Sequence, residues 1–278
     1  MLPRKIKWDQ ARPIVEELIV TRANAQAALS QPHVLAAQVV DIAVRASSVV
    51  SLRDIMRVFS LFDFFNDVLL QREGGKRDEV GAHHDELPPL FFYSGEVEPP
   101  TERRRRAMLL ALGVVYYLRL DYQYRSRFEE SIHGTLQDSK VAPCLKLKAV
   151  LDDVMKTLIS HTESVPGIAR TQGLKENVFM VAMCLFAQIP LMIIGPPGSS
   201  KTLSVAMVAA NAKGTESKSK DSFFRTQRRL IPFHYQCSNR STSREIDAVF
   251  RRAIDRQKTA YGDSTCFVFM DGARSLFA

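Results

Sequence analysis

Cysteines are few in this sequence of 278 residues, and long apolar runs are missing. The four cysteines lie far apart and form no C-x-x-C pair, which argues against a disulfide framework, a zinc finger or a RING-type domain. The longest apolar run, 108–118, is much shorter than the roughly 20 residues of a membrane-spanning helix. No apolar stretch follows the basic N-terminal residues, so a secretory signal is not indicated. We expect a soluble, cytoplasmic protein with no membrane span.

The basic residues do not form the kind of pattern that is typical of nucleic-acid-binding proteins. The formal net charge of +8 and the isoelectric point of about 9.4 invite that interpretation. However, the densest basic run, 103–106, directly precedes an apolar helix-like segment, and a second cluster, 213–220, lies in a serine-rich stretch. We interpret both as solvated faces or loops, since no basic strand with interleaved aromatic residues is found. Nucleic acid is therefore not the favoured partner.

Residues 1–70 have the apolar spacing of helices. One helix is expected to start at 51–54, where a serine is followed three residues later by an aspartate. Its inward face is predicted to carry the apolar residues Ile55, Met56, Phe59, Phe62 and Phe65. Residues 71–164 form a predicted connector: a Gly- and Pro-rich exposed stretch to 101, then helices at about 102–122 and 145–160.

Strands and helices alternate in the last segment, 165–278, which predicts an α/β module with a parallel sheet. The expected elements are a buried helix at 174–187, a short interior strand at 191–194, a helix at 203–210, a strand at 230–236, a helix starting near Ser243 and a strand at 266–270. A capping box is predicted between Thr242 and Glu245. The helix behind it has one apolar stripe expected to pack on the sheet: Ile246, Val249, Phe250, Ala253 and Ile254.

The most informative motif follows the first of these strands and is named here the phosphate loop: Gly195, Pro196, Pro197, Gly198, Ser199, Ser200, Lys201 and Thr202. A sharp strand-to-helix turn brings successive backbone N–H groups around an anion at the positive end of a helix. In a P-loop (Walker A) of this kind, Lys201 reaches the β- and γ-phosphates of ATP and Thr202 ligates Mg²⁺. Ser200 replaces the last glycine of the usual pattern, which requires a negative φ at this serine.

A second functional residue follows the last predicted strand. The apolar run Phe267–Met270 ends in Asp271, whose carboxylate is placed to hold the Mg²⁺ of a bound nucleotide, usually through water. In AAA+ ATPases the next residue is a glutamate that polarises the attacking water. Here that position is Gly272, so no catalytic residue is assigned.

These residues resemble the mysterin family, giant E3 ubiquitin ligases built around a dynein-like array of AAA+ modules. The resemblance covers most of residues 45–271 and is strongest over 165–240. The segments that carry it are Gly173–Met180, Ile189-Pro190, Gly195–Thr202 with its unusual Ser-Ser-Lys, Gln236–Ser238 and Ser241-Thr242. Because the family also has Gly-Ser-Ser-Lys, Ser200 supports the assignment.

The resemblance implies two parts of adjacent AAA+ modules. Residues 1–70 would end a preceding module with its helical lid, and Arg53 would be the sensor arginine for a nucleotide held there. Residues 165–278 would begin the next module and stop after the Walker B aspartate. In AAA+ modules the P-loop strand lies between the fourth and fifth strands, which both follow that aspartate. The strand at 191–194 is therefore expected to lack neighbours, and the sequence to come from a truncated or mis-spliced gene model.

The expected function is that of an ATP-binding AAA+ ATPase fragment, with Mg²⁺ as cofactor. The full-length protein would couple ATP hydrolysis to ubiquitin transfer, with neighbouring AAA+ modules and the ubiquitin machinery as partners. Two alternatives stay open. Gly272 favours a nucleotide-binding scaffold without hydrolysis, which turnover measurements would test. The basic charge favours a P-loop nucleic-acid-binding protein, for which a steep salt dependence of binding is the test.

Overall fold

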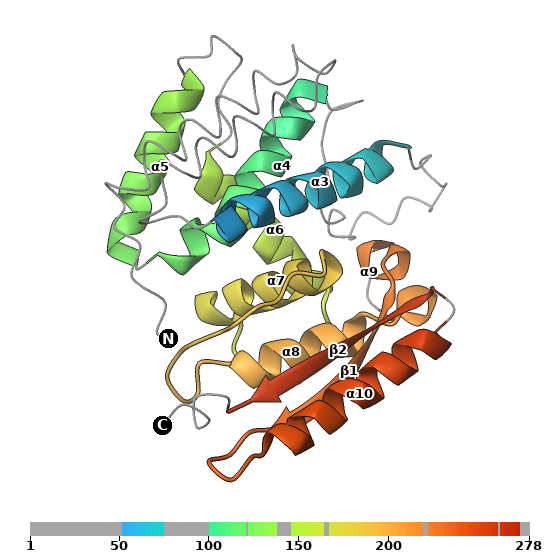
Figure 1. The fold of residues 1–278 in the computed structure, drawn as a ribbon. Helices are drawn as coiled ribbons and strands as arrows, with labels where there is room; N and C mark the ends of the chain where they lie inside the picture. Colours follow the sequence, from blue (N-terminus) through green and yellow to red (C-terminus); the bar gives the residue numbers. More distant parts are fainter. Residues whose placement is uncertain are drawn as a thin grey trace. The chain divides into compact units, whose positions relative to one another are not determined.

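A computed structural model describes residues 52–74, 100–120, 122–137, 146–163, 167–218, 222–260 and 262–272 (Figure 1). The helices predicted before residue 51 and most of the connection at 75–99 lie outside these ranges. The chain forms two compact units, residues 1–82 with 91–154, and residues 83–90 with 155–278. Within the described ranges, no helix combines the length and apolarity that crossing a membrane requires.

The first unit is helical, as predicted. Its elements are α3 (Leu52–Gly74), α4 (Pro100–Val115), the 3₁₀ helix η1 (Tyr117–Arg119), α5 (Tyr122–Gln137) and the first part of α6 (Leu147–His161). The predicted inward face of α3 is confirmed at Ile55, Phe62 and Phe65, which are buried. It is wrong at Met56, which is 54% exposed. Ile55, Phe62 and Phe65 share one face at helical spacing, whereas Met56 is rotated about 100° from Ile55.

The helix predicted over 102–122 is interrupted. It ends at Val115, and α5 starts only at Tyr122, because Leu120 has an extended backbone conformation with φ −76° and ψ 144°. The side chain of Arg119 turns back, and its Nη1 atom donates to the carbonyl oxygen of Val115 at 3.2 Å. This contact satisfies one of the carbonyl groups left open where α4 ends.

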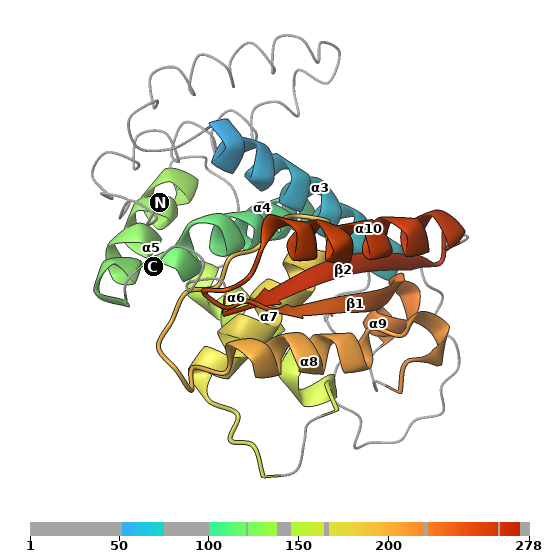
Figure 2. The same ribbon diagram turned by 60° about the horizontal axis from the view of Figure 1, so that its bottom comes forward.

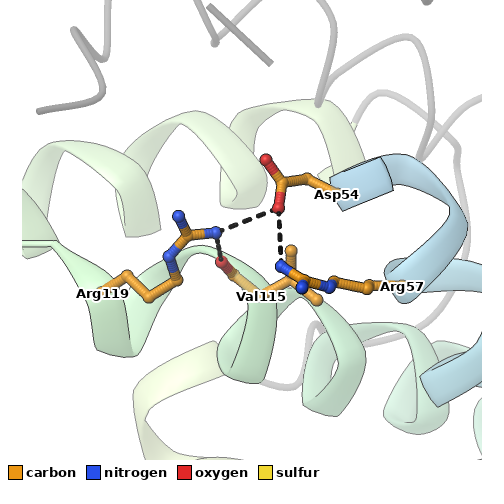
Figure 3. A network of polar contacts seen from close by, with 4 residues as sticks. All are labelled: Asp54, Arg57, Val115 and Arg119. Carbon is orange, nitrogen blue, oxygen red and sulfur yellow. Dashed lines mark hydrogen bonds and ion pairs between the residues drawn. The ribbon is translucent and has the colours of Figure 1, made fainter. Parts of the chain in front are cut away.

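An ion-pair network fixes this corner of the first unit. Figure 3 shows the carboxylate of Asp54, in the first turn of α3, between two guanidinium groups. Asp54 Oδ1 lies 3.3 Å from Arg57 Nη1 and 3.2 Å from Arg119 Nη1. Arg57 belongs to the same helix, whereas Arg119 comes from η1. The start of α3 is thereby joined to the end of the α4 segment.

The basic run 103–106 is not the solvated face that its composition predicts. Arg103 is only 8% exposed, and its Nε atom donates to Oδ1 of Asn66 on α3 at 3.4 Å. Downstream of the run, residues 107–112 of α4 are all buried. An arginine can lie at such an interface because its aliphatic stem covers apolar surface while its head group is hydrogen-bonded.

The second unit has α/β structure as predicted, although one predicted strand is missing. Its elements after α6 are α7 (Gln172–Phe186), α8 (Lys201–Asn211), η2 (Gly214–Glu216), α9 (Ser222–Thr226), β1 (Arg229–Gln236), α10 (Ser243–Thr259) and β2 (Ser264–Asp271). The strands β1 and β2 are parallel, in a register that runs from Arg229 opposite Ser264 to Gln236 opposite Asp271. Figures 1 and 2 show α10 on one face of this strand pair and α8 on the other.

The predicted interior strand at Leu191–Ile194 is not formed. In the described part of the chain the sheet has the order β1-β2, and residues 189–196 have no regular secondary structure. Met192 is 73% exposed and Ile194 is 59% exposed. The physical reason is that a strand needs a ladder partner. This result agrees with the expectation that the segment lacks neighbours.

The capping box of α10 is confirmed. Thr242 Oγ1 accepts from the backbone N–H of Glu245 at 3.3 Å, and Glu245 Oε2 accepts from the backbone N–H of Thr242 at 2.8 Å. The predicted apolar stripe is confirmed only in part. Val249 and Ala253 are buried, while Phe250 is 43% exposed and Ile254 is 52% exposed, because these two lie about 100° further around the helix.

Candidate phosphate-binding site

The phosphate loop lies between α7 and α8, each of which has several buried residues. At the end of α7, Gln188 has a positive φ of 57°, and the N–H of Ile189 donates to the carbonyl of Cys184 at 2.8 Å. This turn directs the chain through 189–194 into the loop. On the other side, α8 begins at Lys201 and is anchored by its buried residues Val205 and Val208. The sequence prediction of a loop followed directly by a helix is therefore confirmed.

Two residues of the loop have left-handed backbone conformations. Gly198 has φ 78°, and Ser200 has φ 61° and ψ 20° immediately before α8. The expectation of a negative φ at Ser200 is therefore wrong. Residue 200 thus keeps a backbone conformation that favours glycine, the residue that the usual pattern has here. For a non-glycine residue this conformation costs roughly 1–2 kcal/mol.

Several backbone N–H groups at the start of α8 are free to bind an anion. Pro196 and Pro197 have no N–H group. The N–H groups of Gly198, Ser200, Lys201 and Thr202 donate to no acceptor among the residues that the structure describes. Such N–H groups at a helix N-terminus attract anions, both as hydrogen-bond donors and through the helix dipole.

The ammonium group of Lys201 is folded back onto the loop. Its Nζ atom donates to the carbonyl oxygens of Gly195 at 2.9 Å and Pro196 at 2.7 Å, and to Ser199 Oγ at 3.0 Å. A Cβ atom at residue 195 would lie 2.8 Å from Ser199 Oγ, so a larger residue there would displace this hydroxyl from Lys201. The cation is thus held at the loop by neutral acceptors.

The hydroxyl of Thr202 and the carboxylate of Asp271 come together at the carboxyl end of β2, 2.9 Å apart. In an octahedral Mg²⁺ shell with bonds of 2.0–2.1 Å, adjacent oxygens are about 2.9 Å apart, so the two groups fit neighbouring positions. No group of three or more His, Cys, Asp and Glu side chains gathers to hold a metal anywhere in the described ranges. A cation here would take its other ligands from phosphate and water, as Mg²⁺ commonly does.

The residue after Asp271 is a glycine in a backbone conformation and a space that both disfavour a side chain. Gly272 has φ 71°, and a Cβ atom there would lie 2.9 Å from Gln236 Nε2 and 3.1 Å from the carbonyl oxygen of Cys237. The neighbouring Cys237 is buried; this burial, and then the charge of Asp271, raise the pKa of its thiol. No carboxylate stands at the position where AAA+ ATPases have their glutamate.

One contact of the loop was missed from the sequence. The Nδ2 atom of Asn177 on α7 donates to the carbonyl oxygen of Ser199 at 2.8 Å. Asn177 is a polar residue beside the buried Val178 and Phe179 in a largely apolar helix, and this is the signal that points to it. Arg53 is exposed in the first turn of α3 in the first unit, and its sensor role concerns another module, so that role stays a prediction.

The helices and the parallel strand pair of the second unit fit an α/β module of the AAA type. Residues 167–274 match the family described as the RNF213 AAA domain. RNF213 is another name for mysterin, so the resemblance found in the sequence is confirmed.

Similar proteins extend the match beyond the module. The human E3 ubiquitin-protein ligase RNF213 is 29% identical over 221 residues, which cover 76% of this chain and 4% of the human protein. Mouse RNF213 is 29% identical over 219 residues, covering 75% of this chain and 4% of that protein. A putative uncharacterized transmembrane protein of Dictyostelium discoideum is 28% identical over 228 residues, which cover 76% of this chain and 4% of that protein. The chain thus spans about 4% of the length of these relatives.

Proposed function

We propose that the second unit binds ATP together with Mg²⁺. The observation that carries this proposal is the convergence of four features on one end of α8: open backbone N–H groups, the Lys201 ammonium, the Thr202 hydroxyl and the Asp271 carboxylate. A chance Gly- and Pro-rich turn would not place a carboxylate from a strand 69 residues further along the chain beside the second residue of the helix.

Each of these groups is proposed to contact a different part of the nucleotide. The N–H groups of Gly198, Ser200, Lys201 and Thr202 donate to phosphate oxygens at the positive end of α8. The Lys201 ammonium exchanges its three loop acceptors for charged phosphate oxygens, which form stronger hydrogen bonds than neutral groups do. Thr202 and Asp271 hold the Mg²⁺ of the nucleotide.

Binding without hydrolysis is a second candidate function, and Gly272 favours it. A water-polarising carboxylate is missing from that position, and any side chain there would meet the carbonyl oxygen of Cys237 in a backbone conformation that favours glycine. Full ATPase activity then needs a water-activating group from elsewhere. Measurement of phosphate release at saturating ATP separates an ATPase module from a nucleotide-binding scaffold.

In a longer protein, we propose that ATP binding by this module supports ubiquitin transfer. Two relatives with this module are named E3 ubiquitin-protein ligases. Neighbouring AAA+ modules of the same polypeptide are the proposed partners, because AAA+ sites are completed by adjacent modules. The ligase activity itself would come from other parts of such a protein.

Calorimetric titration of the 278-residue chain with ATP, with Mg²⁺ and with EDTA, tests nucleotide binding. Lys201→Ala removes the cation and should weaken binding by about 2–3 kcal/mol, a roughly 30- to 150-fold loss. Lys213→Ala, at an exposed lysine two residues after α8, is the matched control and should bind as the unmodified chain does. Equal affinities for the Lys201→Ala variant and the unmodified chain would refute the proposal.

A further inference from the structure

Asn177 reaches the phosphate loop from a fixed position. Its Nδ2 atom donates to the carbonyl oxygen of Ser199 at 2.8 Å, across 22 residues of sequence. The two residues that follow it, Val178 and Phe179, are fully buried, so the backbone of α7 is well anchored here. The contact therefore holds the loop against a rigid element.

Because a peptide unit is planar, this contact also sets the direction of a backbone hydrogen-bond donor, the N–H group of Ser200. The carbonyl of Ser199 and the N–H of Ser200 belong to one trans peptide unit, so they point in opposite directions. When Asn177 holds the carbonyl toward α7, the N–H of Ser200 must point away from α7. That N–H is one of the loop donors with no acceptor in the described ranges.

The same peptide is next to the strained residue of the loop. Ser200 has φ 61°, and such a conformation persists only where the surroundings determine it strongly. Two hydrogen bonds supply that restraint. Asn177 fixes the carbonyl before Ser200, and the N–H of Ser204 donates to the carbonyl of Ser200 itself at 2.9 Å. The second bond belongs to α8 and forms in any helix, whereas the first depends on one side chain.

We propose that Asn177 is a positioning residue that keeps the Ser199–Ser200 peptide oriented for phosphate binding before the nucleotide arrives. The inference rests on the proposed function, because the N–H of Ser200 is taken to donate to a phosphate oxygen. Asn177 contacts the loop backbone, and acts on the phosphate only through the peptide that it holds.

The test compares Asn177→Ala in two backgrounds of the 278-residue chain by calorimetry with Mg²⁺-ATP. Loss of one neutral hydrogen bond should weaken ATP binding about three- to tenfold when residue 200 is serine. With Ser200→Gly, which adopts a left-handed φ without steric cost, the same substitution should weaken binding by about twofold or less. An equal loss in both backgrounds would show a general structural role and overturn the inference.

Two further variants test whether the effect comes from the N–H donor of Asn177. Asn177→Asp keeps the shape of the side chain but removes the N–H donor, so it should bind ATP at least as weakly as Asn177→Ala; full affinity in this variant would overturn the inference. Gln172→Ala, which removes an exposed amide from the first turn of the same helix, is the matched control and should leave affinity unchanged.

A readout without nucleotide separates this inference from the proposed function. If the unmodified chain does not bind ATP, the proposed function fails, but amide hydrogen exchange still reports on the loop. Asn177→Ala should then speed exchange at residues 198–202 and leave β1 and α10 unchanged. Unaltered exchange in the loop would overturn the positioning role, whatever the outcome with ATP.

Discussion

The hydroxyl of Thr202 and the carboxylate of Asp271 lie 2.9 Å apart, although they come from the first turn of α8 and the last residue of β2. Asp271 reaches this place because β2 runs parallel to β1 and both strands end at the same edge of the pair, with Gln236 opposite Asp271. Ligands of α/β proteins bind at the carboxyl ends of parallel strands, and the phosphate loop lies at this end. Residues 69 positions apart in the sequence thus lie together.

Replacing Asp271 should remove the effect of Mg²⁺ on ATP binding. Asp271→Asn keeps the size of the side chain but removes its charge, so ATP affinity measured with Mg²⁺ should fall to the value measured with EDTA. Asp263→Asn changes an exposed aspartate just before the same strand and should keep the Mg²⁺ effect. A titration of Mg²⁺ at fixed ATP checks this, and an unchanged Mg²⁺ dependence in Asp271→Asn would contradict the assignment.

Glycine at position 200 should stabilise the fold. Ser200→Gly relieves the left-handed strain of roughly 1–2 kcal/mol but adds freedom to the unfolded chain, so a net gain of about 0.5–1 kcal/mol is expected. Ser199→Gly is the neighbouring control; it has no positive φ to relieve and loses the contact with Lys201, so it should lower stability. Urea denaturation of both variants gives the free energies of unfolding. If both substitutions raise this free energy, or both lower it, the prediction is wrong.

Acid should weaken the start of α10. Hydrogen bonds from the backbone N–H of Thr242, then from its side chain, lower the pKa of Glu245 in the folded state. Because the folded pKa lies below the unfolded one, this stabilisation is complete above the unfolded pKa, and it is lost as the pH falls through the folded pKa. Thermal unfolding followed from pH 7 down to pH 3 should show this loss, and Glu245→Gln should show a smaller dependence over the same range.

A side chain at position 272 should destabilise the second unit. Gly272→Ala places a Cβ atom against the backbone carbonyl of Cys237 and forces a left-handed φ on alanine, a cost of about 1–2 kcal/mol in the free energy of unfolding. Gly262→Ala is the matched control for the contact: Gly262 has φ 83° but nothing within 4 Å of its Cβ position. Urea denaturation should show a larger loss for Gly272→Ala, and equal losses would mean that the Cys237 contact is unimportant.

The sequence predicted the second unit best where local chemistry decides the structure. The Thr242–Glu245 capping box and the glycine and lysine positions of the loop act within a few residues, so spacing alone located α10 and α8. The apolar strand that ends in Asp271 predicted a second Mg²⁺-binding residue, and the fold brings Asp271 beside Thr202. The errors concern tertiary contacts. Leu191–Ile194 has the composition of a strand but no partner to pair with, and Arg103 is buried by contact with α3.

Two details of the phosphate loop could not be predicted from the sequence. The φ angle of Ser200 depends on how abruptly α8 begins after the turn, and the role proposed for Asn177 depends on which face of α7 meets the loop. Both require the packed structure. Residue types alone could say that serine replaced glycine, but they could not say that the left-handed conformation remained.

The two consecutive prolines of the phosphate loop have a kinetic consequence. Pro196 and Pro197 fix two φ angles in the free chain, and the ammonium of Lys201 already lies within the loop. Little of the loop then has to be ordered when a nucleotide arrives, so encounter should proceed without a slow rearrangement step. Variants of the loop contacts would accordingly differ mainly in how long the nucleotide stays bound, and only slightly in how fast it arrives.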